Sequence, residues 1–298
     1  TRYHGVTGVQ TCALPICENC ENIRSSGENL LGIINDLLDF SKIESGKMEL
    51  VCEEYSLSAL LNDVINMTVA RKGGKALEFM VNVDPKVPER LYGDKIRLRQ
   101  IIINLLTNAV KFTNQGGILL SVSARQESYG INLIISVKDS GIGIEEEAIG
   151  KIFTSFSQVD TKRNHAIEGT GLGLPITKLL VQMMNGVILV DSEYGKGTEF
   201  KVIIPQKVMQ EKPIVSLKEP QKLELLYYIN MKKFGSEFVK EGYQQIIETM
   251  GTGFGVEVHC CTTKEVTGRW LDTHNCTHLF TGKEEYLEDK AFFAEMAQ

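Results

Sequence analysis

The stretch Asn104-Leu-Leu-Thr-Asn-Ala-Val-Lys111 decides the fold of this chain. It lies in a segment that begins near a predicted N-cap at Asp94 and whose apolar residues recur at helical spacing. Asn104, Asn108 and Lys111 are four and three residues apart, so they share a different face of this helix. Amide oxygens can ligate Mg²⁺, and a lysine can bind phosphate as a point charge. The face therefore predicts either a metal–phosphate site or a solvated polar surface. The predicted buried stripe consists of Leu98, Ile101, Ile102, Leu105, Ala109 and Phe112.

A second motif, Asp139-Ser-Gly-Ile-Gly143, follows an apolar run at residues 131–137 that predicts a strand. A carboxylate at a strand end can accept hydrogen bonds from an amino-bearing base such as adenine. Gly141 and Gly143 lack side chains where a backbone must turn sharply or approach a ligand. Taken alone, the motif equally fits a strand followed by an ordinary glycine turn.

A third motif, Gly169-Thr-Gly-Leu-Gly173, opens a predicted helix over residues 174–184. Pro175 suits a first helical turn, and Asn185-Gly186 is a good stop signal. A glycine-rich loop that enters a helix offers free N–H groups to phosphate. The spacing is not that of a Walker A loop, and the mid-chain position does not fit a Rossmann opening turn.

Two further segments have open interpretations. The polar stretch 153–168 contains Phe156, Lys162 and Arg163, and it predicts either a lid that closes on phosphate or a solvated surface loop. Gly195-Lys-Gly197-Thr198 lies between two predicted strands and by itself favours a hairpin turn over a site.

The order of these motifs, with Phe153-x-x-Phe156 before the last glycine loop, resembles the catalytic ATP-binding domain of sensor histidine kinases. The resemblance covers about residues 50–205. It implies an α/β (α+β) two-layer sandwich with a mixed sheet, of the superfamily that also holds gyrase and the heat-shock chaperones. It also implies ATP and Mg²⁺ as cofactors.

The resemblance assigns roles to individual residues. Asp139 would hold the adenine amino group, Asn108 would ligate Mg²⁺ beside Asn104, and Lys111 would contact phosphates under the glycine loop. Asn104 and Lys111 would be the catalytic residues, and Asn108 and Asn104 the metal ligands. The residues expected to bind ATP are Asn104, Asn108, Lys111, Asp139, Gly141, Gly143, Phe156, Lys162, Arg163, Gly169, Thr170, Gly171, Leu172, Gly173 and Thr198.

One residue separates classes within the superfamily. Hydrolytic members carry a glutamate at the position of Asn104, where the carboxylate activates water as a general base. An amide has no comparable basicity, so Asn104 favours phosphoryl transfer, which rests mostly on positioning and charge neutralisation. Two alternatives stay open: an ATP-hydrolysing superfamily member, and a nucleotide-binding signalling scaffold without kinase activity.

Upstream, residues 21–45 predict one amphipathic helix that needs a partner. Asn35-Asp-Leu-Leu-Asp-Phe-Ser-Lys-Ile-Glu-Ser-Gly46 resembles the second helix of the histidine kinase dimerisation hairpin, which implies a homodimer of the full-length protein. In the family, the first hairpin helix carries the phosphoacceptor histidine before Glu-x-Arg. None of the five histidines stands in such a motif, so we expect a kinase that cannot phosphorylate itself as given. The histidines are His4, His165, His259, His274 and His278.

Residues 6–16 have neither helical nor strand periodicity, and they resemble a translated sequencing adapter. We expect residues 1–17 to be non-native and leave them out of fold reasoning, with a genuine N-terminal tail as the alternative. On this interpretation the acceptor helix was lost upstream. Residues 18–46 would then be the hairpin helix and residues 47–205 the ATP-binding domain.

Downstream, residues 206–222 are polar with two prolines and predict a linker. Residues 223–298 alternate strands and helices, which predicts a parallel α/β unit that resembles the first part of a receiver domain. Receivers need an acidic pair and a phosphorylatable aspartate, but Asn230, Met231 and Lys232, then Thr281 and Gly282, hold those places. We therefore expect a partial, degenerate receiver that serves protein–protein contact.

Bulk properties limit the function. A chain of 298 residues, 43% apolar, can build two modest cores and a helical segment. The net charge of −6 argues against a nucleic-acid partner, and no apolar run reaches the roughly 18 residues of a membrane span. Seven scattered cysteines fit a reducing compartment. The sequence thus predicts a cytoplasmic two-component signalling kinase with a response-regulator partner, although a full-length parent can still be membrane-anchored.

Overall fold

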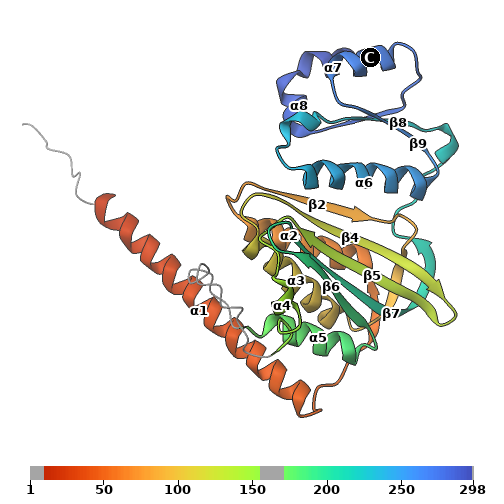
Figure 1. Cartoon of the computed structure of the whole chain (residues 1–298). Coiled ribbons are helices and arrows are strands. Elements are labelled where there is room, and N and C mark those ends of the chain that lie inside the picture. The colour runs from red at the N-terminus through yellow and green to blue at the C-terminus, as the bar shows by residue number, and fades with distance from the viewer. Residues whose placement is uncertain (1–9, 155–170, 297–298) are drawn as a thin grey trace, which may run out of the picture.

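The computed structural model describes residues 10–154 and 171–296 of the chain. Its larger sheet has seven strands in the order β1-β3-β7-β5-β4-β2, with β6 paired to β7 (Figure 1). Only β2 and β4 pair in parallel within this sheet, so the sheet is mixed as predicted. Its strands are β1 (Glu53–Ser56), β2 (Leu77–Val83), β3 (Pro88–Gly93), β4 (Gly116–Glu127), β5 (Gly130–Asp139), β6 (Val187–Glu193) and β7 (Gly197–Pro213).

Helices cover one face of this sheet, which gives the two layers of the predicted sandwich. Alternate strand residues point to these helices; on β4 they are Ile118, Leu120 and Val122, all fully buried. The same cluster includes the inner faces of the covering helices, so one core joins the two layers. The helices on this side are α2 (Leu57–Lys72), α3 (Lys95–Phe112), the short α4 (Glu146–Ile149) and α5 (Gly173–Met183).

Helix α3 begins where the sequence predicts. Asp94 caps it, because its Oδ1 accepts the backbone N–H groups of Ile96 and Arg97, both at 3.0 Å. The predicted apolar stripe is buried except for Phe112, which is only partly buried because it lies in the open last turn of the helix. The stripe is also wider than predicted, since Leu106 and Val110 are buried as well.

Two expectations about element boundaries are wrong. The expected linker at residues 206–222 begins inside β7, which continues to Pro213 and pairs with β3. This end stays in the sheet, because Gln206 is buried, Lys207 is exposed and Val208 is half-buried, as in a strand. The polar residues of this end favour a linker when only the sequence is considered. The first helix, α1 (Gln10–Glu44), begins at Gln10 and not near residue 21, because residues 17–24 contain no helix-stopping signal.

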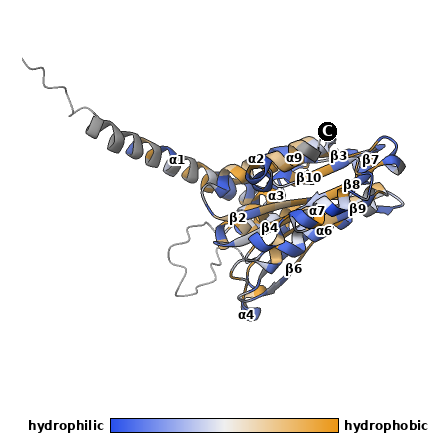
Figure 2. Cartoon of the chain, turned by 90° about the horizontal axis from the view of Figure 1, so that it is seen from above, coloured by the Kyte–Doolittle hydropathy of each residue, from blue (hydrophilic) through white to orange (hydrophobic). Residues whose placement is uncertain are grey.

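Helix α1 projects away from the sheet (Figures 1 and 2). Among the side chains of α1 that the structure describes, Phe40 and Ile43, near its C-terminal end, pack against the core. Many of its other large apolar side chains are exposed: Ile23, Leu30, Leu31, Ile33, Ile34, Leu37 and Leu38. In the parts of the chain that the structure describes, no helix combines the length and apolar character needed to cross a bilayer.

A second sheet of three parallel strands, in the order β10-β8-β9, forms the C-terminal unit. Parallel pairing with helical crossovers is what the alternating sequence pattern predicts. Helix α6 lies between the two sheets and packs against β2 and β4 (Figure 1). The elements are β8 (Glu224–Tyr228), α6 (Glu237–Phe254), β9 (Glu257–Cys261), α7 (Lys264–Leu271), β10 (His278–Thr281), α8 (Lys283–Glu288) and α9 (Lys290–Met296).

Candidate functional site

Asp139 ends β5 between two neighbouring strands, opposite Ile118 of β4 and Thr198 of β7. Its side chain is buried and accepts three hydrogen bonds. The donors are the Gly141 N–H at 2.8 Å, the Thr113 hydroxyl at 3.4 Å and the Thr198 backbone N–H. A carboxylate has about four acceptor positions, so Asp139 keeps capacity for a further donor.

Burial raises the pKa of Asp139 to about 6, although the three hydrogen bonds act in the opposite direction. A buried carboxylate with incomplete hydrogen bonding is held at a cost in free energy. A ligand that donates a hydrogen bond to this carboxylate would reduce that cost. An aspartate with a strongly perturbed pKa therefore supports a binding role at this position.

Neighbouring atoms leave no space for a side chain at Gly141 or Gly143. A Cβ at Gly141 would lie 2.5 Å from the Phe112 carbonyl oxygen, so the turn after Asp139 presses on the end of α3. Gly143 has φ +67°, and a Cβ there would lie 2.1 Å from the Glu193 carbonyl oxygen. Both glycines thus hold the Asp139 turn against its neighbours, as the motif predicts.

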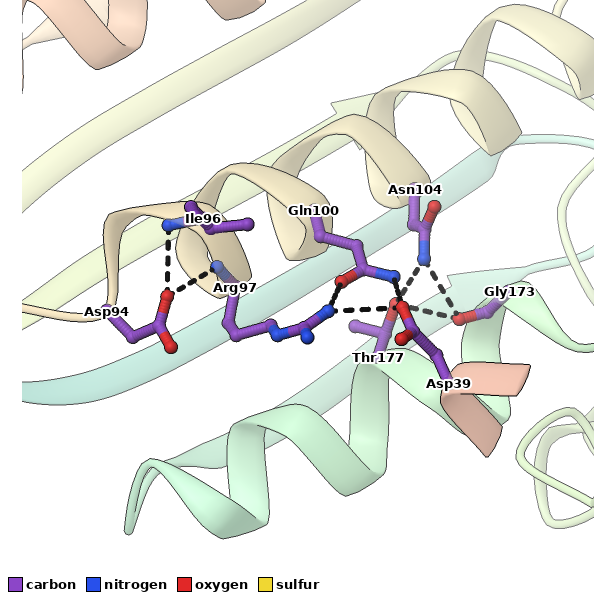
Figure 3. A network of polar contacts seen from close by, with 8 residues as sticks. All are labelled: Asp39, Asp94, Ile96, Arg97, Gln100, Asn104, Gly173 and Thr177. Atoms are coloured by element: carbon purple, nitrogen blue, oxygen red, sulfur yellow. Dashed lines mark hydrogen bonds and ion pairs between the residues drawn. The ribbon is translucent and has the colours of Figure 1, made fainter. Parts of the chain in front are cut away.

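The polar face of α3 meets the first turn of α5 at Asn104 (Figure 3). The Asn104 Nδ2 donates to the Gly173 carbonyl oxygen and to the Thr177 Oγ1, each at 3.4 Å. Thr177 in turn donates its hydroxyl to the Gly173 carbonyl at 2.8 Å. Because a carbonyl only accepts, the amide nitrogen of Asn104 must face α5, and its Oδ1 stays available on the other side.

Asn108 and Lys111 follow Asn104 along the same face and are half-buried. Across the described ranges, Asn108 makes no side-chain hydrogen bond and Lys111 forms no ion pair. Burial lowers the pKa of the Lys111 amine, whose Nζ lies 5.0 Å from the centre of the Phe112 ring. An open amide and an unpaired, partly desolvated ammonium suit a ligand that brings metal and phosphate.

The last glycine motif leads directly into α5. Gly171 has φ +69°, the Leu172 side chain is buried, and Gly173 is the first residue of the helix. The helix start therefore points toward the α3 face through the Asn104 contacts. Five predicted site residues lie outside the described residues, and their positions stay predictions: Phe156, Lys162, Arg163, Gly169 and Thr170.

Thr113 and Thr177 belong to this arrangement and are absent from the sequence-based prediction. Thr177 is a polar residue four positions after Gly173, on a helix whose neighbouring residues Ile176, Leu179 and Leu180 are apolar. Thr113 gave a weaker signal, since a polar residue just beyond a helix is common. Thr198, by contrast, was predicted as a site residue, and the structure brings its backbone N–H to Asp139.

A separate polar network ties α1 to α3 near the site (Figure 3). The Asp39 Oδ2 accepts hydrogen bonds from Arg97 at 3.1 Å and from Gln100 at 3.0 Å. Arg97 also donates to the Gln100 Oε1 at 2.8 Å, so the three side chains form a closed set. This contact fixes the end of α1 one helical turn before Asn104.

Three or more His, Cys, Asp or Glu residues do not cluster as a metal centre anywhere in residues 10–154 and 171–296. A cation at this site would instead be held by the amide oxygens of Asn104 and Asn108 together with phosphate oxygens. This donor set fits Mg²⁺, which prefers oxygen ligands and usually shares them with a nucleotide.

The raised pKa of Asp139 predicts a pH-dependent stability of the ligand-free chain. The folded state holds the proton more tightly than the unfolded state, so stabilisation from Asp139 is complete below pH 3.8 and is lost as pH rises through about 6. We expect the free energy of unfolding to fall by about 3 kcal/mol across this window from this group. Urea denaturation at several pH values should show this fall, and Asp139→Asn should remove it. Equal pH profiles for both proteins would contradict the assignment.

Comparisons with known proteins agree with this geometry. Residues 93–208 match the family described as "Histidine kinase-, DNA gyrase B-, and HSP90-like ATPase". The chain is 43% identical over 188 residues to hybrid signal transduction histidine kinase B of Dictyostelium discoideum, covering 63% of this chain and 9% of that protein. It is 42% identical over 179 residues to sensor histidine kinase GacS of Pseudomonas protegens, covering 60% of this chain and 20% of the relative.

A solved structure is similar over nearly the whole chain. Full-length ShkA in complex with AMPPNP superposes with a TM-score of 0.66 at 27% identity, covering 90% of this chain and 51% of ShkA. The present chain therefore spans a fifth or less of the two curated relatives and about half of the solved one.

Proposed function

We propose that this chain carries a catalytic ATP-binding domain of the histidine kinase kind, as the family match of residues 93–208 and the similar histidine kinases support, and that it transfers the γ-phosphate of ATP to a protein histidine. The observation that carries this proposal is the pairing of a buried, incompletely bonded Asp139 with the open amide and ammonium groups of α3. One end of the site suits an adenine amino group, and the other suits a triphosphate.

Different residues of the site would bind the adenine, the metal ion and the phosphates of the nucleotide. Asp139 accepts the adenine amino group, and the absence of a side chain at Gly141 lets the turn stay close to this carboxylate. Asn108 and the Oδ1 of Asn104 would hold Mg²⁺, which when bound would neutralise phosphate charge. Lys111 adds a positive charge, and the backbone N–H groups at the start of α5 bind phosphate oxygens. Transfer then depends on holding the γ-phosphate in line with an incoming imidazole.

The hydrogen bonds and the low basicity of the Asn104 amide favour phosphoryl transfer over hydrolysis. Its nitrogen is committed to Gly173 and Thr177, and an amide oxygen is too weak a base to activate water. The site therefore lacks the general base that a hydrolytic enzyme needs at this position. We propose a kinase of the two-component type, whose response-regulator partner receives the phosphate.

The flanking units complete the proposal. Helix α1 has the exposed apolar stripe expected of the second hairpin helix, so it would form a homodimer with its copy. In the C-terminal unit, the Lys233 ammonium lies among Glu288 at 3.0 Å, Glu285 at 3.7 Å and Glu284 at 4.0 Å, near the ends of β8 and β10. A built-in cation at this edge supports a degenerate receiver that neither binds Mg²⁺ nor accepts phosphate.

We expect the chain to bind nucleotide without labelling itself, because no histidine stands before Glu-x-Arg. Incubation with γ-labelled ATP should leave no acid-labile label on the isolated chain. Addition of a separate hairpin that carries an acceptor histidine should produce a labelled hairpin. A label on the chain itself would refute the expected inability to autophosphorylate.

The degenerate edge around Lys233 also favours a second candidate function, a nucleotide-binding scaffold without transfer activity. The same hairpin experiment separates the two. A labelled hairpin supports the kinase, whereas nucleotide binding without any label supports the scaffold. Steady phosphate release that Asp139→Asn abolishes would instead point to a hydrolytic enzyme.

A further inference from the structure

The larger sheet has a second face, opposite the one that α2, α3 and α5 cover. This face carries a small apolar area, and the C-terminal unit covers it. Met80 of β2 and Leu119 of β4 point away from the main core, yet they are only 2% and 5% exposed. They form a separate cluster with Val239 of α6. The apolar residues packed around this cluster are all close to or within α6: Phe234, Phe238, Tyr243 and Ile246.

Helix α6 has a face built for this contact. The residues that meet the sheet recur at helical spacing from Val239 to Gly253. Two of them are glycines at points of closest approach: a Cβ at Gly242 would lie 2.6 Å from the Met80 side chain, and one at Gly253 would lie 2.5 Å from the Pro85 ring. A glycine inside a helix is less favourable than alanine, so close packing explains both positions.

Polar contacts extend the same interface. The Asn82 amide donates to the Thr249 hydroxyl at 3.1 Å, and the Tyr243 hydroxyl donates to Glu78 at 3.4 Å. Toward the C-terminal end of α6, residues of the helix and of β2 and β4 line a polar cleft of about 280 Å³. The apolar cluster therefore lies at the N-terminal half of α6, whereas the C-terminal half adds the Gly253 contact beside this cleft.

This N-terminal half lies over the strand end that supports Asp139. Val239 contacts Gly117, whose added Cβ would lie 3.0 Å from the Val239 Cγ2. Gly117 exchanges two hydrogen bonds with Ser140: its N–H donates to the Ser140 Oγ at 2.9 Å, and its carbonyl accepts the Ser140 N–H at 3.1 Å. Ser140 directly follows Asp139, so a continuous set of contacts leads from α6 to the adenine end of the site.

We propose that the α6 face is an intramolecular docking surface that couples the C-terminal unit to nucleotide binding, with Ser140 as the positioning residue between them. When docked, α6 excludes water from the Gly117–Ser140 hydrogen bonds and holds Asp139 in its binding position. When the unit is released, this strand end loses that support. The coupling rests on the proposed ATP site, and by reciprocity bound nucleotide strengthens docking by the same factor.

Two matched variants of the full chain test the docking. Val239→Glu places a carboxylate in the dry cluster, whereas Gln244→Glu places one at an exposed position of the same helix. Hydrogen exchange of residues 77–83 and 116–123 should accelerate in Val239→Glu and stay unchanged in Gln244→Glu. Unchanged exchange in Val239→Glu would overturn the docking surface, and this readout requires no nucleotide.

The coupling is tested by titration with a fluorescent trinitrophenyl derivative of ATP and Mg²⁺. We expect Val239→Glu to raise the Kd about 5-fold or more, and Gln244→Glu to leave it unchanged. In a Ser140→Ala background the Val239→Glu effect should shrink, because the contact path is already broken. The coupling would be overturned if Val239→Glu accelerated hydrogen exchange but left the Kd unaltered. It would also be overturned if Val239→Glu raised the Kd by the same factor in the Ser140→Ala background. Failure of the unmodified chain to bind the probe would instead refute the proposed function.

Discussion

Replacement of Asp139 by asparagine is expected to weaken nucleotide binding by about 10- to 100-fold, the loss that accompanies one hydrogen bond to a charged group. The buried carboxylate of Asp139 already accepts hydrogen bonds from Gly141, Thr113 and Thr198. Asparagine has one acceptor oxygen, and its NH₂ group would face donors. It therefore cannot satisfy these three groups and an adenine amino group together.

Isothermal titration with Mg-ATP measures this loss directly. Glu199→Gln is the matched control, because it makes the same carboxylate-to-amide change on β7 at a side chain hydrogen-bonded to Ser136 at 2.6 Å. It should bind nucleotide as the unmodified chain does. Equal affinity of Asp139→Asn and Glu199→Gln would remove Asp139 from the site.

Replacement of Asn108 by alanine should lower phosphoryl transfer to a separate acceptor hairpin by about 100- to 1000-fold, the usual cost of losing one preorganised electrostatic contact. The amide of Asn108 lies half-buried on α3 without a side-chain partner within the described part of the chain. Its removal would leave Mg²⁺ short of a ligand while the adenine end stays intact.

Initial rates of hairpin labelling from γ-labelled ATP provide the measurement. Asn114→Ala removes the same side chain from an exposed position just beyond α3 and should transfer at the normal rate. Nucleotide binding by Asn108→Ala in the absence of Mg²⁺ should also stay normal. A transfer rate within a few fold of the control would exclude Asn108 as a metal ligand.

The sequence predicts those parts of the site that local chemistry determines. Asp94 caps α3, Gly143 adopts a positive φ, and Asp139 ends a strand, and each of these follows from a few neighbouring residues. The spacing of Asn104, Asn108 and Lys111 fixes their common face for the same reason. The family resemblance then assigns the nucleotide to this face.

Long-range pairing was beyond the sequence. The Asn104 contact with Gly173 and Thr177 depends on how α3 and α5 pack, and no local pattern determines that packing. The sequence predicts a linker where β7 ends, because the alternation there is weak and the partner strand β3 lies far back in the chain. The covering of Met80 by Gly242 likewise needs the position of the C-terminal unit.

The ion pairs of Lys233 with Glu284, Glu285 and Glu288 do not depend on a metal ion from solution. A diffusible cation leaves its carboxylates whenever its free concentration falls, whereas an ammonium attached to the backbone cannot be diluted. Glu285, only 7% exposed, keeps its counter-ion at every Mg²⁺ level, and the Asn230 N–H stays within 3.4 Å of it. The edge of the C-terminal unit would thus hold one shape through changes in metal supply and phosphate load. Such an edge would not respond to metal or phosphate, so a signal that acts on this unit would have to change the docking of α6 on the larger sheet.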